Sequence, residues 1–261
     1  NQISLIATDI DEVLDIDHSP GYVVDSETLF MLTSNRPHSP YVQSLFRYDG
    51  KYWERVYCST ISGADALPDE PTFELVLVSP DFNATNAVFV ANTDFEIWRS
   101  LDAGCSWKKF TFPCAAKRTT IYSGVVIDED TVITGGKATV YKTTRHGTRW
   151  WDDYEVATAG DIMSFDLEPG YEDPGTVLLG DDDSQVFISE DGGEEWDLVG
   201  DLAGPVEGAP TFVVFDPDYA ASNIIYAATG SVIARCVIDP DEDWADQEWE
   251  DIKFSLDADG G

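Results

Sequence analysis

The eight residues Ser100-Leu101-Asp102-Ala103-Gly104-Cys105-Ser106-Trp107 follow the pattern S-x-D-x-G-x-x-W, which returns at residues 189–196. A run of alternating apolar and polar residues precedes each copy, and a short run of polar and apolar residues follows it, as expected for the two strands of a β-hairpin around a turn. Glycine can take the positive φ of such a turn, and Asp and Ser can hydrogen-bond its backbone amides. The pattern predicts two hairpin turns built from Ser100, Asp102, Gly104 and Trp107, and from Ser189, Asp191, Gly193 and Trp196.

A second pattern lies upstream of these turns. Ser, Asp or Glu is followed by Pro, any residue and an aromatic residue at 19–22, 79–82, 168–171 and 216–219. Proline has no amide hydrogen for a β-ladder, so it ends the preceding strand. Each corner followed by a hairpin turn predicts a unit of four strands.

Degenerate copies of the turn extend this repeat over the whole chain. Trp residues at the start of the fourth strand recur at 53, 107, 150, 196 and 249, a spacing of about 43 to 54 residues that suits a propeller blade. We predict an all-β propeller of four-stranded antiparallel blades in one domain, 1–261. The five units are approximately 11–60, 70–116, 119–157, 160–203 and 208–256, and residues 3–8 are a spare ring-closing strand. Either five blades close on themselves or, as we favour, the ring is larger.

The charge of the chain is strongly negative, with 50 acidic and 15 basic residues among 261 and a formal charge of −35. Such a surface repels phosphates and anionic lipid head groups, so we expect no nucleic-acid partner. No run of 18 apolar residues is present, and we expect no membrane insertion. The acidity favours divalent cations or basic partners, or reflects adaptation to high salt.

Two acidic loops are candidate metal sites because clustered carboxylates suit Ca²⁺. One candidate set is Asp181, Asp182 and Asp183, and the other is Asp239, Asp241 and Asp243. Neither has the spacing of an EF-hand. The alternative is that each is a solvated acidic turn.

Four cysteines and one sequon complete the candidate residues. We prefer a Cys105–Cys114 disulfide, which leaves a Cys58–Cys236 pair as the remaining option. Asn83-Ala84-Thr85 is an N-x-T sequon, which carries a glycan only in an exported protein.

These motifs resemble the Asp-box (BNR repeat) of sialidase-like β-propellers, across almost the whole chain. The chain also resembles the propellers of exported cell-surface proteins. The resemblance implies that the box residues are structural and lie away from any active site. It further implies an extracellular or cell-surface scaffold without enzymatic activity, with other proteins, copies of itself, a surface complex or carbohydrate as partners.

Two other functions fit the same resemblance. One is a glycoside hydrolase, which needs two carboxylates facing each other across the central cleft. The other is an assembly factor for a membrane complex, with a basic protein partner.

Overall fold

The computed structural model describes residues 10–19, 28–35, 42–58, 73–92, 96–110, 120–128, 130–144, 150–172, 174–202, 208–230 and 232–252. Their strands form five four-stranded sheets, each with its strands in chain order. The predicted all-β fold of four-stranded blades is therefore confirmed, and we number the sheets blades 1 to 5. The predicted strand at 3–8 lies outside the described residues. Among the helices of the described residues, none is long and apolar enough to cross a membrane.

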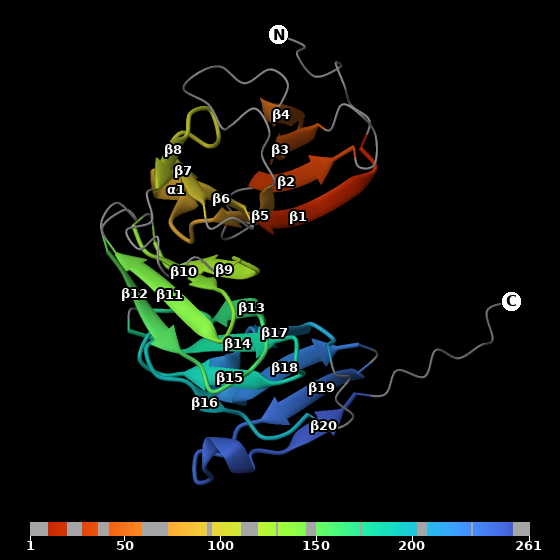
Figure 1. The fold of residues 1–261 in the computed structure, drawn as a ribbon, viewed down its shortest axis with the longest axis vertical. Coiled ribbons are helices and arrows are strands. Elements are labelled where there is room, and N and C mark those ends of the chain that lie inside the picture. Colours follow the sequence, from red (N-terminus) through yellow and green to blue (C-terminus); the bar gives the residue numbers. More distant parts are fainter. Residues whose placement is uncertain are drawn as a thin grey trace, which may run out of the picture. The chain divides into compact units, whose positions relative to one another are not determined.

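The chain forms two compact units. Unit 1, Asn1–Thr134 with Tyr141–Asp152, holds blades 1 and 2 (Figure 1). The strands of blade 1 are β1 (Glu12–His18), β2 (Thr28–Ser34), β3 (Gln43–Asp49) and β4 (Trp53–Cys58). Those of blade 2 are β5 (Phe73–Val78), β6 (Val88–Asn92), β7 (Ile97–Ser100) and β8 (Lys108–Phe110).

Unit 2, Gly135–Val140 with Asp153–Gly261, holds blades 4 and 5. The strands of blade 4 are β13 (Ile162–Leu167), β14 (Val177–Asp181), β15 (Val186–Ser189) and β16 (Asp197–Leu198). Those of blade 5 are β17 (Thr211–Phe215), β18 (Ile224–Thr229), β19 (Val232–Val237) and β20 (Trp249–Asp251), with the 3₁₀ turn η2 (Trp244–Asp246) before β20. Residues of blade 3 belong to both units; its strands are β9 (Ser123–Val126), β10 (Val132–Gly135), β11 (Thr139–Thr144) and β12 (Trp150–Glu155).

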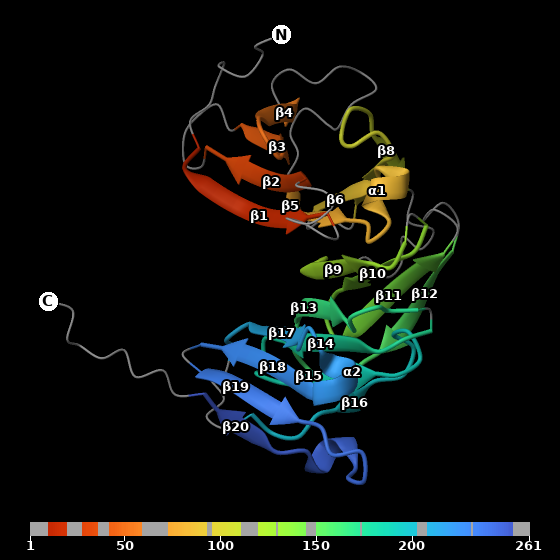
Figure 2. The same ribbon diagram turned by 180° about the vertical axis from the view of Figure 1, so that it is seen from behind.

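The described proline corners, in blades 2, 4 and 5, turn the chain before the second strand; in blade 4 the amide of Tyr171 donates to the Glu168 carbonyl (3.0 Å). The corner at 19–22 lies largely outside the described residues. In blades 2 and 5 the corner becomes a single helical turn, α1 (Phe82–Thr85) and α2 (Tyr219–Ser222), each closed by an asparagine in the left-handed region. Figure 2 shows α2 from behind. Phe82 and Tyr219 fold back onto the first blade's Phe30 and onto Phe215, with ring centroids 5.6 and 4.6 Å apart. In blade 3, between β9 and β10, the carboxylate of Asp128 accepts hydrogen bonds from the amides of Asp130 (2.7 Å) and Thr131 (2.6 Å).

The two hairpin turns have the same hydrogen bonds. The hydroxyl of Ser100 donates to Asp102 (2.7 Å) and accepts from the amide of Gly104 (2.8 Å), while Asp102 accepts from the amide of Ser106 (2.7 Å). The indole of Trp107 donates to the Gly104 carbonyl (3.1 Å). In the second turn the matching bonds measure 2.7, 2.8, 3.0 and 3.1 Å, and they involve Ser189, Asp191, Gly193, Glu195 and Trp196.

The first of these turns also contacts the preceding blade. Arg47 on β3 donates to the carbonyl of Ala103 (3.0 Å). Gly104, with φ +89°, lies so close to Val56 of β4 that a Cβ there would meet that side chain at 2.9 Å. The turn therefore helps to join blades as well as to shape its own hairpin.

Among the described residues, three clusters of buried apolar side chains lie between neighbouring sheets of the same unit. In unit 1, Phe30, Leu32, Phe73, Val76 and Trp98 belong to the cluster between blades 1 and 2. A second cluster joins Leu77 and Phe89 of blade 2 to Val126 and Val132. In unit 2, the cluster between blades 4 and 5 includes Leu178, Ile188, Val213, Phe215 and Ala234.

The hairpin turn predicts a local loss of stability in a defined variant. Asp191→Ala removes the acceptor of the Ser189 hydroxyl and of two backbone amides, so the free energy of unfolding of unit 2 should fall by about 1–2 kcal/mol. Chemical denaturation measures this fall. Glu194→Ala is the matched control, because the Glu194 side chain is exposed. Equal losses in the two variants would show that the Asp191 carboxylate does not hold the turn.

Candidate functional site

Three partly buried carboxylates lie on the first strands of blades 1 and 4. The carboxylates of Asp15 and Asp17 on β1 accept hydrogen bonds from the backbone amides of Val76 (2.8 Å) and Val78 (2.6 Å) on β5 of the next blade. In unit 2, Asp166 on β13 accepts the amide of Phe215 on β17 (2.8 Å). Each carboxylate thus joins its blade to the first strand of the next one.

Burial changes the ionisation of these groups. Desolvation, against which the backbone hydrogen bonds act, raises the pKa of Asp15 to about 7 and that of Asp166 to about 6. Burial also raises the pKa of Asp17. Perturbed carboxylates often mark catalytic sites. Here, however, each is engaged with backbone amides of a neighbouring strand, which is a structural role, and none of these contacts supports the glycoside hydrolase alternative.

The first predicted metal loop begins at the end of β14. Asp181 is fully buried and accepts the hydroxyl of Thr158 (2.5 Å) and the amide of Asp183 (3.0 Å). Asp182 accepts the amide of Asp161 (2.6 Å). Desolvation raises the pKa of Asp181. The carboxylates of Asp181 and Asp182 therefore accept hydrogen bonds from hydroxyl and amide groups of the protein itself.

The second predicted metal loop lies between β19 and β20. Asp239 accepts the amide of Asp241 (2.9 Å), and Asp243 precedes η2 without a side-chain capping bond. The side-chain amide of Gln247, which is only 4% exposed, hydrogen-bonds the backbone of this loop. It accepts the Asp239 amide (2.8 Å) and donates to the carbonyls of Asp239 (2.9 Å) and Glu242 (3.3 Å).

Within the described ranges, no three His, Cys, Asp or Glu side chains come together in a way that could hold a metal ion. The predicted Ca²⁺ sites at Asp181, Asp182 and Asp183 and at Asp239, Asp241 and Asp243 are therefore not preformed there. Calcium binding stays a prediction of the sequence.

The cysteines and the sequon fall in different settings. Cys105 is exposed in the first hairpin turn, while Cys114 lies outside the described residues, so their disulfide stays a prediction. Cys236 is a free thiol buried in unit 2, so the Cys58–Cys236 option is not formed. Burial raises the pKa of the Cys236 thiol to about 11. Asn83 is exposed on α1, and its glycosylation also stays a prediction.

The loop after β19 forms one wall of a pocket in unit 2. This pocket has a volume of about 290 Å³, and we call it the acid–aromatic pocket. Its other walls are the second hairpin turn and α2. It is lined by Glu190, Tyr219, Asp239, Glu242, Trp244 and Gln247, with three further residues.

The shape of the pocket depends on two close contacts beneath the loop. The amide of Gly200 donates to the carbonyl of Trp244 (3.0 Å), and a Cβ at Gly200 would lie 2.0 Å from the carbonyl oxygen of Gln247. Only glycine fits at this approach, where φ is +49°. Trp244 is held half-buried against the core of unit 2.

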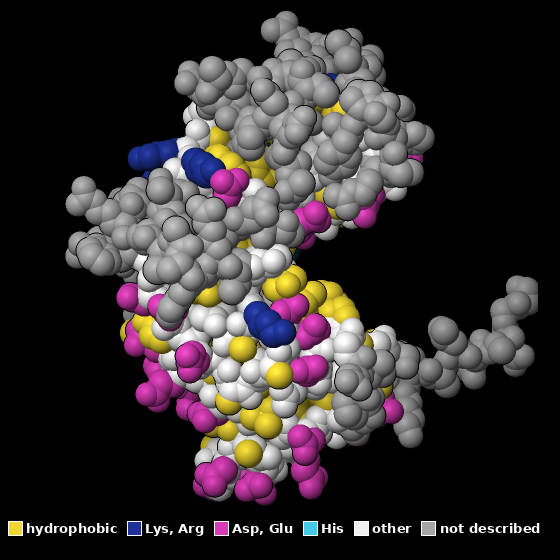
Figure 3. All heavy atoms as spheres, viewed as in Figure 1, with side chains coloured by type: hydrophobic (Ala, Val, Ile, Leu, Met, Phe, Trp, Pro, Cys, Tyr) yellow, Lys and Arg dark blue, Asp and Glu magenta, His cyan; other side chains and the backbone are white. Residues whose placement is uncertain are grey.

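The electrostatics of the pocket favour a cation. Glu190, Asp239 and Glu242 are exposed around its rim. Burial, with Glu168 and Glu190 nearby, raises the pKa of Tyr219, which keeps its phenol neutral. Faces of Tyr and Trp attract cations, and carboxylates attract them more strongly. Figure 3 shows acidic side chains, in magenta, spread over the visible surface of unit 2.

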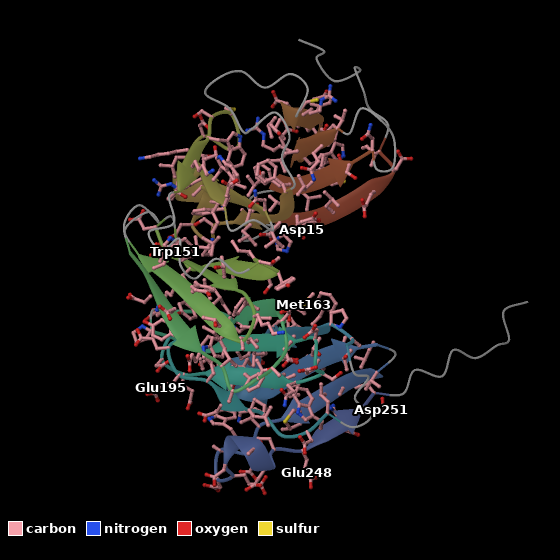
Figure 4. All side chains as sticks on the ribbon, in the orientation of Figure 1. Asp15, Trp151, Met163, Glu195, Glu248 and Asp251 are labelled. Carbon is pink, nitrogen blue, oxygen red and sulfur yellow. The ribbon has the colours of Figure 1, made fainter. Side chains whose placement is uncertain are left out.

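An open groove of about 660 Å³ adjoins the pocket on the other side of the loop. It shares Asp239, Glu242 and Gln247 with the pocket, and its other lining residues are Arg235, Val237, Glu248, Trp249 and Glu250. Figure 4 shows Glu248 on the segment between η2 and β20. The two hollows thus share one acidic loop.

The sequence motifs do not single out the residues that shape this site. They predict Asp239, but as a metal ligand. They place Glu190, Tyr219 and Trp244 only in the turn, the corner and a degenerate turn. The sequence could have indicated Asp15 and Asp17, because two carboxylates at alternate positions in a strand lie on the same face of the sheet.

The comparisons with known proteins show the fold. No protein-family model matches this chain, and no curated protein matches it. Among solved structures, the chain is similar to YCF48 from Cyanidioschyzon merolae, with a TM-score of 0.54, 14% identity and 87% of this chain covered. It is also similar to a structure of YCF48 bound to D1 peptide, with a TM-score of 0.52, 13% identity and 86% covered. This chain spans 66% and 63% of those two chains. The blades are those of a β-propeller.

The partly buried carboxylate of Asp15 predicts a pH effect on stability. Its folded pKa lies above the unfolded value of 3.8, so its neutral form stabilises the fold below that value, and this stability is lost as the pH rises towards 7. In Asp15→Asn the side chain stays neutral. Between about pH 4 and about pH 8 the variant should gain about 2–4 kcal/mol relative to the wild type.

Chemical denaturation at fixed salt measures this difference. Asp152→Asn, at an exposed position on β12, is the control and should behave as the wild type at every pH. A constant offset between Asp15→Asn and the wild type, independent of pH, would contradict the raised pKa.

Proposed function

We propose that this chain is a non-enzymatic interaction propeller that binds a lysine- or arginine-bearing segment of a partner protein. The acid–aromatic pocket is the observation that carries this proposal. It combines three exposed carboxylates with Tyr219 and Trp244 in a hollow of about 290 Å³. That combination suits one cationic side chain, with the adjoining groove available to the residues beside it.

The comparison with YCF48 supports a peptide as the ligand. One of the two similar structures is described as bound to D1 peptide, so a protein with this fold binds a peptide. The formal charge of −35 supports the choice of a basic segment, because the whole surface attracts cations and so speeds encounter with such a partner.

The proposal extends to where the protein acts. We place it outside the cell or at the cell surface, as a scaffold in a surface complex. This part is supported by the resemblance to exported propellers and by the exposure of the sequon residue Asn83. Protease treatment of intact cells of the source tests it: digestion of this protein, with cytoplasmic proteins spared, is the expected result.

Binding of a basic peptide tests the pocket directly. The probe is a fluorescent peptide of about twelve residues that alternates Lys and Ala, with a version acetylated at every Lys as the uncharged match. We expect the charged peptide to bind, the acetylated one not to bind, and affinity to fall as salt screens the carboxylates. Glu190→Gln with Glu242→Gln should weaken binding about fivefold to tenfold.

The control keeps the same change in net charge. Asp152→Asn with Glu155→Gln neutralises two exposed carboxylates on β12, outside the pocket, and should bind as the wild type does. Equal weakening in both double variants would mean that the peptide responds to net charge alone, and the pocket would not be its site.

A further inference from the structure

The acid–aromatic pocket lies at the joint of blades 4 and 5, and the joint of blades 1 and 2 offers an internal comparison for it. Each joint has a corner helix that is closed by an asparagine, Asn86 after α1 and Asn223 after α2. The carbonyl of that asparagine accepts an amide of the turn after the third strand, from Ala103 (3.1 Å) in blade 2 and from Ile238 (2.8 Å) in blade 5. Ala103 and Ile238 therefore occupy corresponding positions.

The aromatic residue of the corner fills the first joint but not the second. Phe82 of α1 is only 4% exposed and packs edge-on against Phe30 of blade 1, with ring centroids 5.6 Å apart. The matching residue of α2, Tyr219, packs instead on Phe215 of its own blade (4.6 Å). Tyr219 is half-buried, and the hollow of about 290 Å³ lies beside it. The pocket is thus a space that the first joint fills with its own side chains.

An arginine completes the first joint. Arg47 on β3 pairs with Phe30 of β2 across the sheet. Its guanidinium donates from one terminal nitrogen to Glu54 of its own blade (2.6 Å) and from the other to the Ala103 carbonyl of blade 2 (3.0 Å). One planar group therefore binds a carboxylate and a turn carbonyl at the same time, as the forked geometry of arginine allows.

Blade 4 has no arginine at this position. Leu178 stands where Phe30 stands, because each lies two residues after the threonine whose carbonyl accepts the first amide of the corner. Ile188 pairs with Leu178 and so takes the place of Arg47. Within the described residues, no donor hydrogen-bonds to the carbonyl of Ile238, the one that corresponds to the carbonyl bound by Arg47.

The pocket offers a guanidinium the same two kinds of acceptor. Ile238 lines the pocket, while Glu190 and Glu242 are exposed at its rim. Tyr219 and Trp244 add aromatic faces on which a planar guanidinium can stack. A lysine ammonium is a single nitrogen, which does not span two separate acceptors as the arginine fork does.

We propose that the acid–aromatic pocket selects arginine over lysine, with the guanidinium donating to the Ile238 carbonyl and to the rim carboxylates. This inference rests on the proposed function, the binding of a basic segment, and names the side chain that the pocket takes. All the pocket residues belong to unit 2. The chain thus contains its own template for the complex, in the contact of Arg47 with Ala103 in unit 1.

Two peptides of equal length and charge test the selection. One alternates Lys and Ala, as above, and the other alternates Arg and Ala. The Arg peptide should bind about tenfold more tightly, because it makes one further hydrogen bond from a charged donor. In Glu190→Gln with Glu242→Gln this advantage should fall below about threefold, because the carboxylates that orient the guanidinium are gone. Asp152→Asn with Glu155→Gln should keep the full advantage.

The carbonyl carbons give a second readout. In protein labelled with ¹³C, the Ile238 carbonyl resonance should move downfield when the Arg peptide is added, because that oxygen accepts a hydrogen bond. The Lys peptide should leave it in place. The Ala103 carbonyl, already bound by Arg47, is the internal reference and should move with neither peptide.

The outcomes separate this inference from the proposed function. If the two peptides bind equally and both weaken in the pocket variant, the pocket binds basic segments but the choice of arginine is wrong. An Arg advantage that persists unchanged in the pocket variant would also overturn the inference, because it would arise at another site. If neither peptide binds, the proposed function fails and the inference fails with it.

Discussion

The joints between blades depend on the free edge of each first strand. β1, β5, β13 and β17 are all edge strands of their sheets, so one row of their backbone amides has no partner within the blade. Side chains of the preceding blade satisfy these amides at two joints. Asp15 and Asp17 serve β5, while Ser164 and Asp166 serve β17.

The chemistry of two positions on the first strand decides how each blade binds the next one. The positions five and three residues before the corner proline hold polar side chains in blades 1 and 4. In blade 2 they hold Leu75 and Leu77, and in blade 5 they hold Phe212 and Val214. A polar pair binds the next strand through its amides, and an apolar pair binds it by packing. In blade 5 the apolar pair, Phe212 and Val214, is 58% and 50% exposed.

The sequence predicts the fold better than the site, for a physical reason. Turns and corners depend on residues close together in the chain, such as Ser100 with Gly104, so their pattern is visible without a structure. The pocket depends on contacts between distant segments, such as Gly200 with Trp244 and Glu190 with Tyr219. The acidic loop at Asp239 resembles a metal site because its carboxylates are visible in the sequence. The hydrogen bonds from the buried Gln247 side chain to the backbone of Asp239 are not visible there.

Amide hydrogen exchange at the joint of blades 4 and 5 tests this account most directly. In the wild type, the amides of Val213 and Phe215 should both exchange slowly, because they donate to Ser164 (3.2 Å) and Asp166 (2.8 Å). In Asp166→Ala, exchange at Phe215 should be at least about tenfold faster while Val213 stays protected. Unchanged exchange at Phe215 would contradict the claim that first-strand side chains hold the blades together.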